Sequence, residues 1–272
     1  MDRRLAPATD RVAHVSLRGQ VAADRYVEGQ AFLVSVGLAD LLAAPMGALR
    51  RQLWLGDGFT VIDRDQGYAY GFAAKDGYCG WLAEAALTLG PQPTHWVAAP
   101  GTHLYTEPRV QAPNPIALPM GAQLTVTGQT GKWAETSNGY LPASHLLLLG
   151  QWLADPVTVA ESLLGTPYLW GGNSRNGLDC SGLVQGAHLA CGIPLPGDAD
   201  LIEGAGRPLD PSEPLQRGDL IFWKGHVALV VDETRLIHAN GHTMSVAYDG
   251  ISACIARIDA AEGLQPSSRR RL

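Results

Sequence analysis

One of the four cysteines stands where nucleophilic chemistry is possible. Cys180 lies between Asp179 and Ser181, and an apolar-periodic segment follows directly. This pattern predicts a loop that delivers the cysteine to the first turn of a helix, with Asp179 as N-cap. The N–H groups and partial positive charge of a helix N-terminus stabilise a thiolate, the nucleophilic form of cysteine. A buried structural cysteine is the alternative interpretation.

Two histidines could serve this cysteine as base and orienting group. His226 opens one apolar strand candidate and His238 closes the next, with a polar turn at 232–234 between them. In an antiparallel pair the start of the first strand lies near the end of the second, so the two side chains should be neighbours. A cysteine nucleophile needs a base, and that base needs an orienting partner.

Two other interpretations of the histidines stay open. They can be incidental polar residues on a half-buried sheet, or they can bind a metal together with His242. Asn240-Gly241 breaks the helix that would align His238 with His242, and no carboxylate is well placed. We therefore expect no metal and no other cofactor.

Charge and composition exclude several partners and compartments. The net charge of −6 disfavours nucleic acid, and the basic run 269–271 is expected to be a frayed, solvated end. No apolar run reaches signal-peptide or transmembrane length, which predicts a cytoplasmic protein without membrane insertion. The cysteines form no Cys-x-x-Cys pair, so we expect free thiols at all four positions, Cys79, Cys180, Cys191 and Cys254.

Turn signals and composition divide the chain into four parts. Residues 1–30 form an extension with modest structure, and 31–90 and 91–150 share one cadence of short strands and glycine turns. This cadence indicates an internal duplication of a small all-β barrel. In 151–272, helices that carry the cysteine precede an antiparallel set of strands, which predicts an α+β domain.

The last part resembles the NlpC family of bacterial cell-wall cysteine peptidases, which have a papain-like fold. The resemblance covers residues 151–258, and both upstream repeats resemble bacterial SH3-like domains. The implied fold is therefore an α+β papain-like domain preceded by two small all-β SH3-like barrels. Five motifs in one order carry the resemblance: Gly165–Gly172, Asp179–Leu183, Leu215–Phe222, Gly225–Ala228 and Leu236–Ala239.

The resemblance assigns roles to the residues around the cysteine. Cys180 would be the nucleophile, His226 the general base and then acid, and His238 the third residue that orients His226. The Tyr168 hydroxyl would help to stabilise the oxyanion, and Trp170 would wall the pocket.

It also implies a substrate, a murein tripeptide or tetrapeptide. Asp179 and Ser181 would hold its amine and carboxylate groups. The architecture is similar to that of cytoplasmic γ-D-glutamyl-L-diamino-acid endopeptidases, which cut peptides with a free N-terminal L-Ala and function in cell-wall peptide recycling. In these the first SH3-like domain closes the cleft, Tyr78 matches a tyrosine that reaches the substrate, and Asp57 is a candidate partner for the amine. Blocking that amine should abolish cleavage.

One departure from the family keeps other functions open. The family commonly has Pro-Arg-Asp-(Ser/Thr) after the nucleophile helix, whereas this chain ends the same motif at Ala199. Loss of the hydroxyl leaves the preferred diamino acid open, and with it another amidase or acyltransferase activity on the same fold. A non-catalytic peptide-binding module is the third interpretation, and the sequence indicates no oligomeric state.

Overall fold

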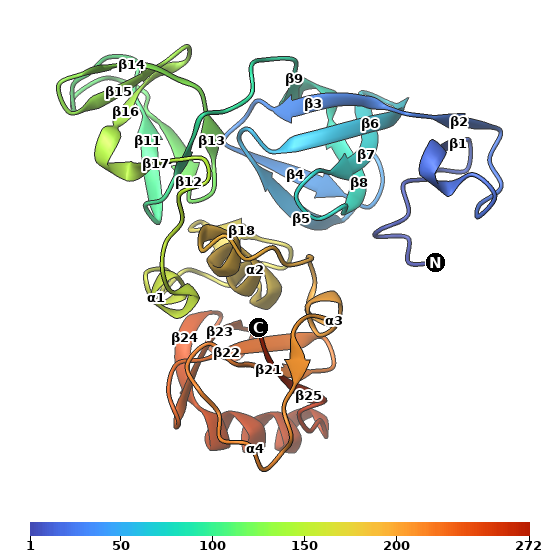
Figure 1. The fold of residues 1–272 in the computed structure, drawn as a ribbon, viewed down its shortest axis with the longest axis vertical. Helices are drawn as coiled ribbons and strands as arrows, with labels where there is room; N and C mark the ends of the chain where they lie inside the picture. The colour runs from blue at the N-terminus through green and yellow to red at the C-terminus, as the bar shows by residue number, and fades with distance from the viewer. The chain divides into compact units, whose positions relative to one another are not determined.

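A computed structural model of the protein describes residues 1–272, which form two compact units, Met1–Gly150 and Gln151–Leu272. Figure 1 shows that the first is built almost entirely of strands, whereas the second combines helices with one sheet. Each unit has its own apolar core. The units are therefore described separately.

The first barrel is a seven-stranded antiparallel sheet in the order β5-β4-β8-β7-β6-β3-β9. Sequence patterns did not predict β5, because Arg50, Arg51 and Gln52 interrupt its apolar alternation. Arg51 is nevertheless buried, with its guanidinium 5.4 Å from the centre of the Tyr78 ring. The elements are β3 (Gln30–Val34), β4 (Leu38–Leu42), β5 (Leu49–Trp54), β6 (Gly58–Asp65), β7 (Tyr68–Ala73), β8 (Cys79–Ala83), the 3-10 helix η2 (Glu84–Ala86) and β9 (Leu87–Thr88).

The second barrel repeats these pairings element by element. Its first strand (His95–Val97) pairs with Gln123–Leu124 and with the last strand (Leu146–Leu148), in the same way that β3 pairs with β6 and β9 in the first barrel. Gly121, with φ of +89°, stands where Gly56 has φ of +79° in the first barrel. The elements are β10 (His95–Val97), β11 (Gly101–Leu104), β12 (Ile116–Pro119), β13 (Gln123–Leu124), β14 (Val126–Thr130), β15 (Trp133–Thr136), β16 (Gly139–Pro142), η3 (Ala143–His145) and β17 (Leu146–Leu148).

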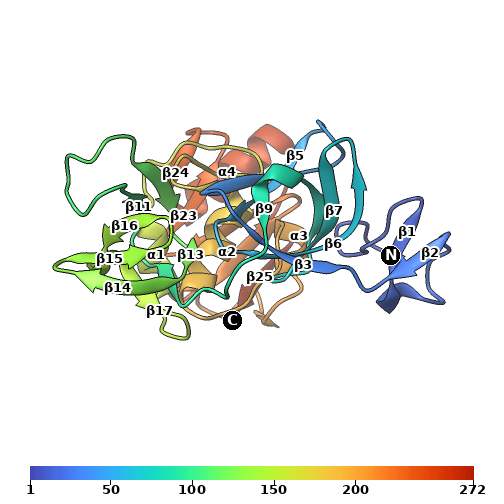
Figure 2. The same ribbon diagram turned by 90° about the horizontal axis from the view of Figure 1, so that it is seen from above.

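The first 30 residues have more structure than the sequence predicted. They contain the parallel pair β1 (Val12–His14) and β2 (Arg25–Val27), with η1 (Val15–Leu17) between them. Figure 2 shows this pair beside the first barrel. The Arg11 guanidinium is ion-paired with Asp63 of β6 at 3.0 Å, and the Cys79 N–H donates to the Arg4 carbonyl oxygen. The extension is therefore part of the first unit.

The second unit holds a six-stranded sheet in the order β20-β25-β21-β22-β23-β24. The ribbon in Figure 1 places α2 and α4 on opposite faces of this sheet. The helices are α1 (Pro156–Glu161), α2 (Cys180–Ala190), α3 (Ala199–Ile202) and α4 (Ile251–Glu262). The strands are β18 (Asn173–Ser174), β19 (Gly177–Leu178), β20 (Arg207–Pro208), β21 (Leu220–Trp223), β22 (His226–Val230), β23 (Arg235–Asn240), β24 (Ser245–Gly250) and β25 (Ser268–Arg271).

The prediction of a frayed C-terminus was wrong. The basic run belongs to β25, which pairs with β21 inside the sheet. Arg271 donates from Nε and Nη2 to the two carboxylate oxygens of Asp219, each at 2.7 Å, and Asp219 is 1% exposed. A buried acid thus holds the last strand in place.

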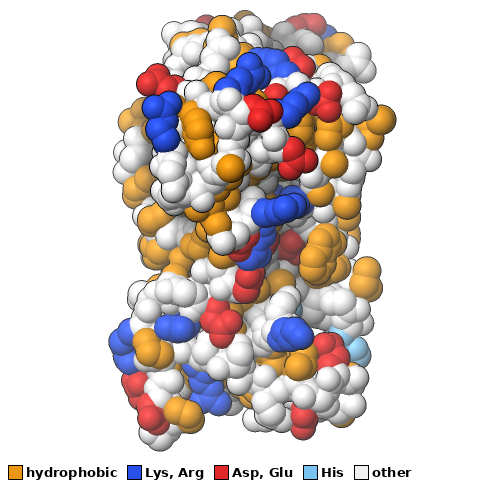
Figure 3. All heavy atoms as spheres, turned by 90° about the vertical axis from the view of Figure 1, so that its right-hand side faces the viewer, with side chains coloured by type: hydrophobic (Ala, Val, Ile, Leu, Met, Phe, Trp, Pro, Cys, Tyr) orange, Lys and Arg blue, Asp and Glu red, His pale blue; other side chains and the backbone are white.

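The surface, the helices and the cysteines add three observations. Basic and acidic side chains are interspersed on the face drawn in Figure 3. No helix has both the length and the apolar character needed to cross a membrane. All four cysteines are free.

Candidate active site

The predicted nucleophile is the first residue of α2. The Asp179 carboxylate caps this helix: Oδ1 accepts from the Gly182 N–H at 2.6 Å, and Oδ2 accepts from the Gly171 N–H at 2.8 Å. Gly182 is required because a Cβ there would lie 2.4 Å from the carbonyl oxygen of Gly172. The Asp179 carboxylate therefore links the loop at Gly171 to the first turn of α2, and Cys180 lies between the loop and that turn.

The two histidines form the expected contact. His226 begins β22, His238 lies on β23, and His226 Nε2 is 2.9 Å from His238 Nδ1. The ring centres are 5.1 Å apart. His238 is 1% exposed, so this hydrogen bond is shielded from water.

Cys180 lies against the start of β22. Its Sγ is 4.0 Å from the carbonyl oxygen of Gly225, and the nearby Val227 N–H acts to lower the pKa of the thiol. The sulfur thus touches the residues on both sides of His226. Because Nε2 of His226 is engaged with His238, Nδ1 is the ring nitrogen left to take a proton from Cys180.

The ionisation of this pair differs from the sequence expectation. Burial raises the pKa of Cys180 to about 12, and the Asp179 carboxylate adds to this. The N–H groups of Val227, Ser181 and Cys180 act in the opposite direction, as predicted for a helix N-terminus, but burial outweighs them. Burial lowers the pKa of His226 to about 4, with a contribution from Arg257. Thiol and imidazole are therefore both neutral at rest.

The other predicted residues of this unit, Tyr168, Trp170 and Ser181, differ in burial and in their contacts. Burial, and then the nearby Cys180 and Asp179, raise the pKa of Tyr168 to about 12, so its hydroxyl stays protonated beside the nucleophile. Trp170 is 68% exposed, and its role as a pocket wall stays a prediction. Ser181 is buried and donates to Asp179 Oδ1 at 2.9 Å. Asp179 thus serves as the helix cap and Ser181 binds its carboxylate, and contact of either residue with a substrate stays a prediction.

Two predicted residues belong to the first unit. Tyr78 packs in the core of the first barrel, and its N–H donates to Asp76 at 3.0 Å. Asp57 accepts from Lys75 Nζ at 2.7 Å and from the Trp54 N–H at 2.9 Å, and it is 3% exposed. This internal ion pair removes Asp57 as a free acid for a ligand amine. A role for Tyr78 toward a substrate stays a prediction.

The metal interpretation needs a correction. A carboxylate does lie near His238: ligand atoms of His238, Asp249 and Cys254 all lie within 4.8 Å of one another. However, the Arg257 guanidinium is ion-paired with Asp249, and its Nη2 is 3.5 Å from Cys254 Sγ. A fixed cation therefore already occupies two of the three ligands, and we assign no metal.

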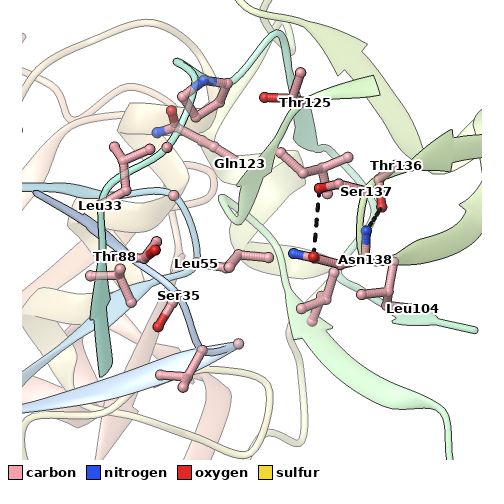
Figure 4. Close-up of a pocket in the computed structure, with 18 of the residues that line it drawn as sticks. Leu33, Ser35, Leu55, Thr88, Leu104, Gln123, Thr125, Thr136, Ser137 and Asn138 are labelled. Atoms are coloured by element: carbon pink, nitrogen blue, oxygen red, sulfur yellow. Dashed lines mark hydrogen bonds between the residues drawn. The ribbon is translucent and has the colours of Figure 1, made fainter. Parts of the chain in front are cut away.

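A separate cavity of about 670 Å³ lies between the two barrels of the first unit (Figure 4). Its lining is apolar with neutral polar groups such as Ser35, Gln123 and Asn138. It contains no thiol, imidazole, acid or base. This cavity can hold a ligand but offers neither a thiol nor an imidazole, and Cys180 stays the candidate nucleophile.

Comparison with known families identifies the second unit. Residues 165–255 match the family described as NlpC/P60, and residues 41–87 match the bacterial dipeptidyl-peptidase SH3 domain. The second unit is an NlpC/P60 domain. Both motif-bearing histidines and the cysteine lie within the matched range, and the papain-like α+β fold expected from sequence is confirmed.

Two curated relatives match long stretches of this chain. Dipeptidyl-peptidase 6 of Lysinibacillus sphaericus is 34% identical over 49% of this chain and 56% of its own length. A γ-D-glutamyl-L-lysine dipeptidyl-peptidase of Bacillus cereus is 28% identical over 70% of this chain and 67% of its own length. The chain thus spans between about half and two thirds of these relatives.

A solved structure has a similar fold. An NlpC/P60 family protein from Bacillus cereus aligns with a TM-score of 0.75, covering 89% of this chain and 99% of that chain. Sequence identity is 21%, so this likeness concerns the fold alone.

Sequence reasoning missed the groups behind the histidines of the NlpC/P60 domain. Trp223, at the end of β21, packs against the His226 ring with centres 5.7 Å apart. An aromatic residue directly before the Lys224-Gly225 turn was the available signal. Asp249 and Arg257 lie behind His238 and gave no local signal, because their proximity depends on strand register and helix docking.

Proposed function

We propose that this chain is a cysteine peptidase that hydrolyses the bond between γ-D-Glu and a diamino acid in murein stem peptides with a free N-terminal L-Ala. The hydrogen bond between His226 and His238, beside the sulfur of Cys180, is the observation that carries this proposal. The names of the two relatives above support the substrate class. A cytoplasmic setting and a part in peptide recycling belong to the proposal and rest on the sequence expectations.

The geometry supports a two-step acyl transfer. His226 Nδ1 takes the thiol proton while Cys180 Sγ attacks the γ-carbonyl carbon of D-Glu, and His238 holds the His226 ring. The Tyr168 hydroxyl, which stays protonated near Cys180, and the Cys180 N–H would stabilise the oxyanion. His226 then protonates the departing amine of the diamino acid, which leaves a thioester. Water, deprotonated by His226, hydrolyses the thioester and restores the thiol.

Product analysis of defined peptides tests the proposal. L-Ala-γ-D-Glu-L-Lys and its diaminopimelate counterpart should each yield L-Ala-γ-D-Glu plus the free diamino acid by mass spectrometry. Cys180→Ala should reduce turnover by roughly a thousandfold or more. Cys191→Ala, a free thiol near the far end of α2, is the matched control and should keep normal turnover.

Two results would redirect the proposal. Unchanged cleavage of the N-acetylated tripeptide would remove the requirement for a free amine. Full alkylation of Cys180 without cleavage of either peptide would favour another amide or acyl-transfer substrate. That second candidate is favoured by Ala199, a buried position that offers no hydroxyl to a diamino acid.

A further inference from the structure

The polar contacts around the histidines continue beyond His238. His238 Nε2 lies 3.9 Å from Asp249 Oδ2, and Arg257 is ion-paired with the same carboxylate. The ladder between β23 and β24 pairs Leu236 with Asp249 and His238 with Ala247. Asp249 is therefore the diagonal neighbour of His238 on one face of the sheet, the face that α4 covers.

We propose that Asp249 is a positioning residue for the cysteine–histidine chemistry, because its charge selects the tautomer of His238 and, through it, that of His226. This inference rests on the proposed function. The 3.9 Å separation is too long for a direct hydrogen bond, so the effect is one of charge on the Nε2–H dipole.

The hydrogen bond between the two histidines allows two proton arrangements. In the first, His226 donates from Nε2 to His238 Nδ1, and the His238 proton on Nε2 faces the Asp249 carboxylate. His226 Nδ1 is then free to take the Cys180 proton. In the second, His238 donates from Nδ1, so the His226 proton lies on Nδ1 and blocks acceptance from the thiol. Asp249 favours the first, productive arrangement.

The other charged groups around His238 set the size of this effect. Burial is the largest cause that lowers the pKa of His238; His226, Arg257 and His242 lower it further, whereas Asp249 raises it. Arg257 also lowers the pKa of His226. Asp249 and Arg257 therefore act on the histidines with opposite signs, as the two opposite charges of an ion pair must.

Alkylation of Cys180 by iodoacetamide, followed by mass spectrometry of its peptide across pH, reads the proton arrangement without any peptide substrate. Asp249→Asn should slow alkylation at pH 7 by about threefold to tenfold, the effect of losing one modest polar interaction. Arg257→Gln should instead speed it. Asp249→Glu should restore most of the rate. Asp259→Asn, an exposed acid on α4, makes the same charge change and should leave the profile unchanged.

The inference is overturned if Asp249→Asn and Arg257→Gln shift the alkylation profile in the same direction, or if Asp249→Asn leaves it unchanged. If Asp249→Asn does not fold, the comparison of Arg257→Gln with Asp249→Glu decides, and a slower rate in Arg257→Gln would refute the idea. Failure of the proposed function is distinguishable, because it appears as absent peptide cleavage with these alkylation shifts intact.

Discussion

Substitution of Asp179 should lower stability and raise thiol reactivity at the same time. Its carboxylate accepts from the N–H groups of Gly182 and Gly171 and from the Ser181 hydroxyl. Asp179→Ala removes a helix cap and leaves a second buried N–H without a partner, which together cost about 2–4 kcal/mol of unfolding free energy. For a unit of this size that corresponds to a fall in Tm of roughly 10 °C.

The reactivity of Cys180 should respond in the opposite sense. The Asp179 carboxylate is the largest contribution after burial that raises the pKa of the Cys180 thiol. Asp179→Asn keeps the shape and removes the charge, so the thiolate becomes easier to form. We expect alkylation of Cys180 at pH 7 to be about threefold to tenfold faster than in the wild type.

Differential scanning calorimetry and timed iodoacetamide labelling measure the two effects. Ser181→Ala is the matched control, because it removes one of the three hydrogen bonds and leaves both N–H groups with their acceptor. A Tm of Asp179→Ala within 2 °C of the Ser181→Ala value, or slower alkylation in Asp179→Asn, would refute the reasoning. A raised KM for the tripeptide in Asp179→Asn, with kcat kept, would show in addition that Asp179 contacts the substrate.

Three further predictions concern the same unit. Tyr168→Phe should reduce kcat by roughly tenfold to a hundredfold with little change in KM. A raised KM with an unchanged kcat would exclude an oxyanion role. Burial holds the pKa of His226 at about 4 and that of His238 at about 3, below the usual 6.5. The unfolded chain therefore binds more protons between these values, and urea titrations should show stability falling as pH drops from 7 to 4, whereas a rise would contradict the neutral state. Deletion of residues 269–272 should lower Tm more than Arg269→Leu does, because Asp219 loses its partner Arg271. Equal changes in Tm would instead support the original prediction of a frayed C-terminus.

The positions of the candidate catalytic residues could be predicted because their signals are local. Cys180 follows a cap residue at a helix start, and His226 and His238 bracket a short hairpin whose turn fixes which strand ends meet. Their contact needed only strand direction, a rule that holds for any antiparallel pair. The overall α+β class followed from the order of helices and strands in the same way.

Longer-range features could not be predicted from patterns. The partner of Arg271 lies 52 residues earlier at Asp219, and a run of arginines has no apolar alternation that would mark a strand. Asp249 meets His238 only because β23 and β24 pair in one particular register, and Arg257 joins them because α4 packs on that face. The ionisation of Cys180 was misjudged for a related reason, since burial depends on the whole fold.

The neutral state of the Cys180–His226 pair changes which groups matter most for activation. A helix N-terminus that ionised Cys180 by itself would leave His226 only the task of protonating the leaving amine. In the proposed reaction, burial keeps the thiol protonated, so the attack would require His226 to accept that proton, and this is possible in only one of its two neutral tautomers. The residues behind His226 then control the rate of the first step as well as its geometry. Burial of His238, at 1% exposure, serves the same end, since water at Nδ1 would compete for the hydrogen bond that selects the productive tautomer.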